Sequence, residues 1–180
     1  MVTVSKSIFS NLVRAFYLRV TYGIGGPIIS TVRGVEILLD LESIYHIFDI
    51  APIGLRVYKS KIWPTMLGFE PREVVQRIFG FRDAQGMGKP LTHSLTMISR
   101  VLHHMICSII LPRDEHQDEV SYYEAFLIDS ILSGKRIHLG YLMMMHMISC
   151  CESRTHVLPY SRFLTRVFKD ADVDLSRERF

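Results

Sequence analysis

The stretch IHLGYLMMMHMISCC, residues 137–151, decides the fold class of this chain because it is the longest apolar segment without a charged side chain. It is shorter than the about 20 residues that a membrane-spanning helix needs, and it contains His138 and His146. A helix that is apolar on nearly every side is typical of a protein core. We therefore predict a helix from about His138 to Glu152 as the central and most buried element, with no membrane association.

Helical patterns flank this segment on both sides. Ser121-Tyr122-Tyr123-Glu124 is a capping box, which predicts a helix that ends at Gly134. A last helix is predicted from Pro159 to Asp170. A longer one is predicted from His93 or Ser94 to Leu111, where Pro112 follows. Its expected core face consists of residues at helical spacing: Leu95, Ile98, Leu102, Met105, Ile106 and Ile109.

The first half of the chain mixes short helices with β-prone segments. Gly23-Ile24-Gly25-Gly26-Pro27 is a turn signal after an extended segment, and residues 28–32 and 35–38 are β-prone, which predicts a small antiparallel hairpin around this turn. Three short helices are expected, each marked by its capping residue: one after Ser7, one after Asp40, and one from Glu70-Pro71 to Gly80.

Length and composition fit one globular domain. The chain has 180 residues, of which 48% are hydrophobic and 22% charged, with a net charge of +3. These values exclude a wholly disordered chain and require neither a nucleic-acid nor a lipid partner. We predict a mainly α, compact helical domain of about six or seven helices with a small N-terminal β-hairpin. It spans residues 1–180 as a single domain, with a weak internal boundary near residues 81–92.

Cysteine usage indicates an intracellular protein. The three cysteines, Cys107, Cys150 and Cys151, are odd in number and two are adjacent, which is a poor disulfide framework. We expect a nuclear or cytoplasmic location. The alternative is an organelle, because no acidic residue precedes Glu36 while serines and basic residues do, as in a transit peptide.

Two His/Cys pairs are the sharpest metal candidates. His103 and Cys107 are four residues apart on one predicted helix, and His146 and Cys150 are four apart on another, so a two-His, two-Cys zinc site is conceivable. However, the first pair projects away from the predicted core face and the second lies within it. We therefore predict no metal and no other cofactor.

Enzyme motifs are weak in this sequence. Gly86-Met87-Gly88-Lys89 lacks the first glycine and the Ser or Thr of a phosphate loop, because Asp83 and Pro90 stand there. The acidic residues around His116, from Asp114 to Glu119, fit a solvated loop. No catalytic residue and no small-molecule substrate is assigned. A metal-dependent enzyme, built on this loop or on the His/Cys pairs, stays open as an alternative.

A basic stripe gives a second alternative. Arg162, Arg166 and Lys169 stand at helical spacing on the last predicted helix, and Arg154 lies just before it. Such a stripe can follow a phosphate backbone, although a solvated helix face explains it as well.

Four segments carry a family resemblance. They are VRAFY (13–17), VRGV (32–35), the run from LHH (102–104) to LPR (111–113), and FLIDSILSGKRI (126–137). In this order they resemble the putative plant transposon protein domain, over about residues 8–170. The resemblance implies a plant source and a retroelement origin, and it carries no catalytic residues. It also leads us to expect a fragment of a longer reading frame.

The expected function is a non-enzymatic, retroelement-derived structural or interaction module with an unknown protein partner. The alternatives are a nucleic-acid-binding accessory domain, which would use the C-terminal basic helix, and the metal-dependent enzyme.

Overall fold

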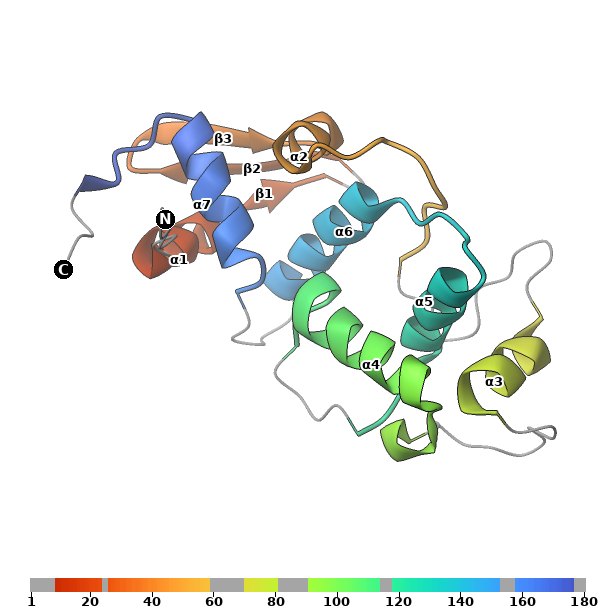
Figure 1. Cartoon of the computed structure of the whole chain (residues 1–180). Helices are drawn as coiled ribbons and strands as arrows, with labels where there is room; N and C mark the ends of the chain where they lie inside the picture. Colours follow the sequence, from red (N-terminus) through yellow and green to blue (C-terminus); the bar gives the residue numbers. More distant parts are fainter. Residues whose placement is uncertain are drawn as a thin grey trace, which may run out of the picture. The chain divides into compact units, whose positions relative to one another are not determined.

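The computed structural model describes residues 9–23, 26–58, 70–80, 91–113, 118–152 and 158–176 (Figure 1). Over these residues the chain forms seven α-helices and one three-stranded antiparallel sheet near the N-terminus. The predicted mainly α class with a small β-hairpin is confirmed. The chain divides into two compact units: unit 1 comprises Met1–Pro52 and Met144–Phe180, and unit 2 comprises Ile53–Met143.

Unit 1 contains the sheet and the helix α1 (Ser10–Leu18). Strand β1 (Thr21–Tyr22) pairs with β2 (Ile28–Val32), as predicted for the glycine-rich turn between them. A second hairpin joins β2 to β3 (Val35–Leu39). The β character of residues 35–38 was predicted from the sequence, but this second pairing was not. Arg33 and Gly34 connect these strands with φ of 51° and 82°. Two left-handed residues form the tight turn whose twist suits a two-residue hairpin.

Two helices and one end of a third complete unit 1. Helix α2 (Leu41–Phe48) begins at Asp40, and α7 (Ser161–Asp170) follows Tyr160. Helix α6 (Leu139–Glu152) belongs to this unit from Met144 onward. The core forms where the inner sheet face meets α1 and α7; its fully or nearly fully buried side chains include Phe16, Ile28, Val32, Ile37, Leu39, Leu164 and Phe168. The ring centroids of Phe16 and Phe168 lie 6.1 Å apart.

Unit 2 is built around α5 (Tyr122–Leu132). Helix α3 (Pro71–Phe79) packs on it, and so does α4 (Met97–Met105) (Figure 1). The fully buried Asp129 of α5 forms an ion pair with Arg77 of α3 and lies 3.5 Å from the Lys135 Nζ. An apolar core cluster surrounds α5 and includes Val74, Ile78, Ile106, Val120, Phe126, Ile128 and Leu142.

The burial of α5 and α6 differs from the prediction. Helix α6 lies in the core as expected, since Leu142, Met143, Met144 and Met147 are all at most 4% exposed. However, α5 is buried without interruption from Tyr123 to Ser130, whereas α6 alternates buried and half-buried residues. The prediction that α6 is the most buried element is therefore wrong. The physical reason is that α3 and α4 both cover α5.

The long helix predicted for residues 93–111 is divided in the structure. A short 3₁₀ turn, η1 (Thr92–Ser94), is followed by α4, which continues as one π-helical turn, η2 (Ile106–Ile110). The predicted core face is wrong at three of its six positions, because Ile98, Met105 and Ile109 are 66%, 46% and 64% exposed. In their place, the polar side chains of the opposite face point inward.

Over the described residues, no helix is both long enough and apolar enough to cross a bilayer. The weak boundary predicted near residues 81–92 falls mainly on residues 81–90, outside the described part, and it stays a prediction. The predicted cap Ser7 and the loop Gly86-Met87-Gly88-Lys89 also lie outside the described residues.

Candidate functional site

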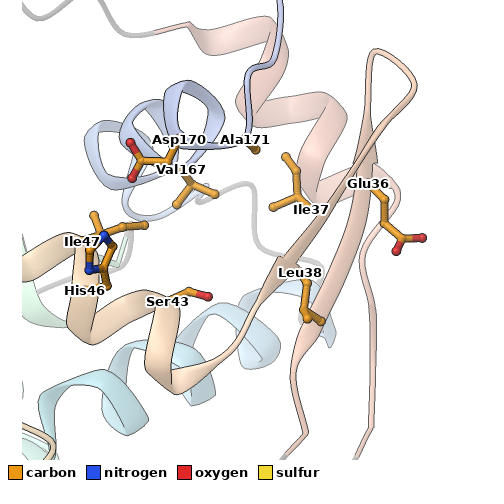
Figure 2. A pocket seen from close by; sticks show the side chains of 9 residues that line it. All are labelled: Glu36, Ile37, Leu38, Ser43, His46, Ile47, Val167, Asp170 and Ala171. Carbon is orange, nitrogen blue, oxygen red and sulfur yellow. The ribbon is translucent and has the colours of Figure 1, made fainter.

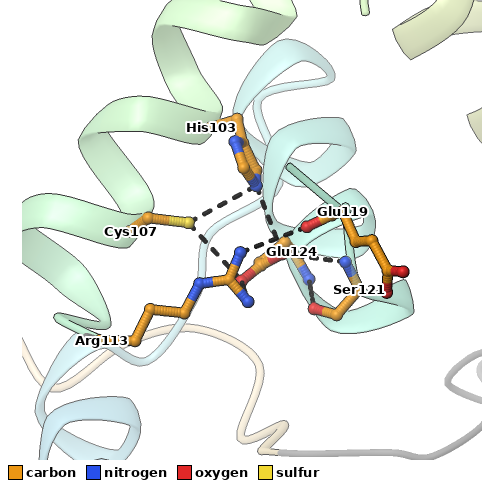
Figure 3. A network of polar contacts seen from close by, with 6 residues as sticks. All are labelled: His103, Cys107, Arg113, Glu119, Ser121 and Glu124. Atoms are coloured by element: carbon orange, nitrogen blue, oxygen red, sulfur yellow. Dashed lines mark hydrogen bonds and ion pairs between the residues drawn. The ribbon is translucent and has the colours of Figure 1, made fainter. Parts of the chain in front are cut away.

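A buried polar cluster joins α4 and η2 to the start of α5 in unit 2 (Figure 3). His103 and Cys107 project from one face of the α4–η2 segment toward Glu124 of α5. The His103 Nε2 lies 3.3 Å from Glu124 Oε2 and 3.5 Å from Cys107 Sγ. The Cys107 thiol donates to Glu124 Oε1 at 3.5 Å. His103 and Cys107 are each 1% exposed and Glu124 is 4% exposed, so the cluster is closed to bulk water.

The capping box fixes Glu124 in place. The Ser121 backbone N–H donates to Glu124 Oε2 at 2.8 Å, and the Glu124 N–H donates to Ser121 Oγ at 3.2 Å. Burial alone would raise the pKa of Glu124, but the His103 hydrogen bond, the Ser121 N–H and the Arg113 charge together hold that pKa below its usual range. Glu124 is therefore a buried carboxylate at neutral pH.

Arg113 supplies the nearest full positive charge. Its Nη1 lies 3.1 Å from Glu124 Oε1, and its Nη2 donates to the Glu119 carbonyl at 3.2 Å (Figure 3). The Arg113 side chain is 30% exposed, and its Nε is buried without a hydrogen-bond partner. The guanidinium thus closes the solvent side of the cluster.

A cysteine, a histidine and a carboxylate together resemble the composition of a nucleophilic triad. Burial, and next the charge of Glu124, raise the pKa of Cys107 to about 12. The side chain is therefore a thiol at neutral pH, whereas the attacking species in cysteine chemistry is the thiolate. Since the group is also closed to substrate, this arrangement does not provide an activated nucleophile.

The second predicted pair is also formed, but in unit 1. His146 Nε2 lies 3.7 Å from Cys150 Sγ on α6, and the His146 ring contacts Tyr160 at a centroid distance of 5.8 Å. Within the described residues, a group of three potential metal ligands forms only at His103, Cys107 and Glu124. Each predicted pair is thus brought together within itself, and the two pairs belong to different units.

The basic residues of α7 lie on its exposed face. Arg162, Arg166 and Lys169 are exposed, while Phe163, Leu164, Val167 and Phe168 of the same helix are buried. Arg154 lies outside the described residues, as do Asp114, Glu115 and His116 of the acidic loop. The structure therefore describes three members of the predicted stripe.

A small cavity of about 230 Å³ lies in unit 1 (Figure 2). It is lined by β3, α2 and the end of α7, through Glu36, Ile37, Leu38, Ser43, His46, Ile47, Val167, Asp170 and Ala171. Its charged or titratable members, Glu36, His46 and Asp170, are exposed. Because these groups already interact with water, nothing in the cavity calls for a ligand.

One surface feature was missed by the sequence analysis. Five apolar side chains form one exposed face along α4 and η2: Met97, Ile98, Val101, Met105 and Ile109, at 82%, 66%, 56%, 46% and 64% exposure. Four of them recur every four residues, which is a helical ridge. Apolar residues occur on all sides of this helix, so the sequence pattern alone could not identify which face is exposed to solvent. Glu124 was recognised as a cap, but not as a partner of His103 and Cys107.

A family model described as a putative plant retrotransposon-related domain matches residues 1–174. No curated protein and no solved structure matches the chain. The resemblance to a plant mobile-element family is thereby confirmed over nearly the whole length.

Proposed function

Because the chain belongs to the family of putative plant retrotransposon-related domains, we propose that it is a non-enzymatic interaction module inside the cell, which binds a helix of a partner protein through α4 and η2. The observation that carries this proposal is the exposed apolar face of Met97, Ile98, Val101, Met105 and Ile109. Contiguous apolar surface of this kind marks interaction sites. The three free cysteines agree with a reducing compartment.

The geometry of this face suits a helical partner. The α4–η2 segment, Met97–Ile110, is about 20 Å long at the usual helical rise. Side chains at four-residue spacing form a ridge that fits between the ridges of a second helix. An amphipathic helix that lays its apolar face on this one would cover all five side chains.

Charge favours a partner with carboxylates over a second copy of this chain. Residues 91–113 contain no Asp or Glu, and the exposed polar side chains beside the apolar face include His93, Arg100 and His104. Of these three side chains Arg100 carries the full positive charge, so two copies packed through this face would place two arginines at one interface, whereas an acidic flank on the partner would be complementary. The partner is therefore a helix with one apolar face bordered by Glu or Asp.

A synthetic probe tests this proposal. We expect the full chain to bind a labelled amphipathic peptide with a leucine ridge bordered by glutamates in a fluorescence anisotropy titration. The same peptide with lysines in place of the glutamates should bind at least tenfold more weakly. The double substitution Val101→Ser, Met105→Ser should abolish binding without loss of helical circular dichroism.

Leu18→Ser, Leu38→Ser is the matched control, because these leucines are 84% and 54% exposed in unit 1, outside the proposed face. It should bind the glutamate peptide as the parent chain does. Three outcomes contradict the proposal: equal binding of both peptides, a dimer in light scattering that the Val101 and Met105 substitutions dissociate, or binding to anionic lipid vesicles that they abolish. The second indicates self-association and the third a membrane surface.

Nucleic-acid binding through α7 is the second candidate, favoured by the exposed Arg162, Arg166 and Lys169 on one helix face. Three phosphate contacts would give a slope of about 2–3 in log affinity against log salt. The measurement compares the parent chain with Arg162→Glu, Arg166→Glu on one oligonucleotide at two salt concentrations. Steep, tight binding that this folded variant loses would place nucleic-acid binding ahead of protein binding, whereas weak binding by both proteins removes this candidate.

A further inference from the structure

We propose that His103, Cys107 and Glu124 form a zinc site in unit 2, with the His103 Nε2, the Cys107 Sγ and one Glu124 carboxylate oxygen as ligands. The sequence offered the two His/Cys pairs as one four-ligand site and, because the pairs were expected to face different ways, predicted no metal. The structure adds a third ligand type to one of them, from a different helix. This inference is independent of the proposed docking face.

The distances between the ligand atoms match a zinc coordination sphere. Zn–N, Zn–O and Zn–S bonds of about 2.0–2.3 Å in a tetrahedron separate the ligand atoms by about 3.3–3.6 Å. The observed separations are 3.3 Å for His103 Nε2 to Glu124 Oε2, 3.5 Å for His103 Nε2 to Cys107 Sγ, and 3.5 Å for Cys107 Sγ to the other carboxylate oxygen, Glu124 Oε1. With one ligand atom from each residue, the three atoms all lie within 4.8 Å of one another. A zinc ion can therefore be held after a small adjustment of side chains that brings one carboxylate oxygen close to both other ligands.

The ligands are held in place before any metal arrives. His103 and Cys107 are one turn apart on the continuous α4–η2 segment, and Glu124 is fixed by its capping box with Ser121. A hydrogen bond to a coordinating carboxylate is a usual means of orienting a metal ligand. A mixed set of one sulfur, one nitrogen and one oxygen suits zinc better than magnesium or calcium, which prefer oxygen alone.

The position of Arg113 indicates how the fourth coordination site is completed. Its guanidinium lies 3.1 Å from Glu124 Oε1 and balances the buried carboxylate. Because its side chain is 30% exposed, Arg113 can turn toward solvent and give up its contacts with Glu124 and the Glu119 carbonyl when zinc takes over this balancing charge. Water then occupies the fourth position. Binding releases the Cys107 thiol proton to the buffer and requires the His103 tautomer that carries its proton on Nδ1.

The test uses the purified full chain, stripped with a chelator and then equilibrated with zinc. Elemental analysis should find one equivalent of zinc, and the melting temperature should rise with zinc concentration, because an ion that binds only the native state stabilises it. Cobalt in place of zinc should give a thiolate-to-metal absorption band, which reports directly on the Cys107 sulfur.

Two variants and a matched control make the outcome specific. Cys107→Ser should lose the cobalt–thiolate band, and Glu124→Gln should bind zinc at least tenfold more weakly. Cys150→Ser is the control, since His146 and Cys150 are also four residues apart but lack a third ligand among the described residues. It should behave as the parent chain does. If the parent chain holds well under one equivalent, or if Cys150→Ser removes the band while Cys107→Ser keeps it, the proposal is wrong.

Discussion

Asp40 holds the start of α2 with its carboxylate. Its Oδ1 accepts hydrogen bonds from the backbone N–H and from the hydroxyl of Ser43, at 2.8 and 2.7 Å. The backbone hydrogen bond of Ser43, and next its hydroxyl, lower the pKa of Asp40. An N-cap of this kind typically contributes about 0.5–2 kcal/mol.

Two substitutions of Asp40 should separate the contribution of its hydrogen bonds to stability from the contribution of its negative charge. At pH 7 we expect Asp40→Ala to lose about 1 kcal/mol of unfolding free energy, and Asp40→Asn, which keeps an acceptor, to lose less. Because the folded pKa is lowered, the charge stabilises the fold above the unfolded pKa of about 3.9 and ceases to do so as the pH falls through the folded value. In urea unfolding, the unfolding free energy of the parent chain should approach that of Asp40→Asn at low pH. The difference in unfolding free energy between Asp40→Asn and Asp40→Ala should not change with pH. A parent chain that keeps its advantage at low pH would contradict this.

Gly54 lies tightly against the backbone of residues 136–138. Its φ is 121°, and a Cβ there would lie 2.5 Å from the Ile137 carbonyl carbon and 2.7 Å from the His138 nitrogen. The neighbouring Leu55 exchanges two backbone hydrogen bonds with this segment, to Arg136 O at 2.9 Å and from His138 N at 3.1 Å. A side chain at position 54 must therefore break this bridge.

We predict that Gly54→Ala lowers the unfolding free energy by about 1–3 kcal/mol from backbone strain, and further because the new side chain would clash with Ile137. The matched control is Gly23→Ala, because no atom lies within 4 Å of a Cβ at that position. It should change the same free energy by less than about 1 kcal/mol. Equal effects of the two substitutions in urea unfolding would show that the close approach does not constrain the fold.

The contacts of some residues can be predicted from their neighbours in the sequence, and those of others cannot. The Ser121–Glu124 capping box was predictable, because both partners lie within one helical turn. The contacts of Glu124 with His103 and Arg113 were not, because a partner 21 residues away depends on how α4 packs on α5. Gly54 gave no signal, since its constraint comes from Ile137.

At the scale of the element, α4 is the helix whose buried side the sequence predicted least well. Helix starts were accurate at Asp40, Glu70 and Ser121, and α3 ends at Gly80 as predicted. By contrast, α1 begins at Ser10, after Phe9, and not directly after the predicted cap Ser7. In α4 apolar residues occur on all sides, and the rule that polar groups face solvent selects the wrong side. The buried side is decided instead by Ser99, His103 and Cys107, two of which meet Glu124 inside the protein.

Two isoleucines on this segment test its orientation. Ile106 is fully buried, so Ile106→Ala should cost about 2–5 kcal/mol of unfolding free energy. Ile98 is 66% exposed, so Ile98→Ala should cost less than about 1 kcal/mol. Denaturant midpoints of the two variants provide the comparison. The opposite ranking would mean that the face predicted from the sequence is the buried one after all.

At the scale of the whole molecule, the division into two units is a consequence of contacts between distant parts of the chain. Unit 2 is continuous from Ile53 to Met143, whereas unit 1 combines both ends of the described chain. The sequence predicted the helices on either side of these limits but not the division. No change in composition marks Pro52 or Met143, and the pairing of Phe16 with Phe168 spans more than 150 residues.

Two phenylalanines should report on the units separately. Phe168 is fully buried in unit 1 and Phe126 is 1% exposed in unit 2, so replacing either by Ala should cost about 3–5 kcal/mol. In hydrogen exchange of the full chain, Phe168→Ala should reduce protection mainly in α1, β2 and β3. Phe126→Ala should reduce it mainly in α3 and α5. Equal loss of protection in both units from either substitution would indicate a single cooperative structure.

The composition of unit 1 from two separated segments has a consequence during protein synthesis. The ribosome completes α1 and the sheet early, but Phe163, Leu164 and Phe168, which cover them, are among the last described residues to be made. At ordinary elongation rates this delay is on the order of 10 s, and all of unit 2 is synthesised within it. A nascent chain therefore exposes the apolar side of β2 and β3 throughout that interval. Any premature stop codon before α7 would leave that surface permanently uncovered and prone to aggregation.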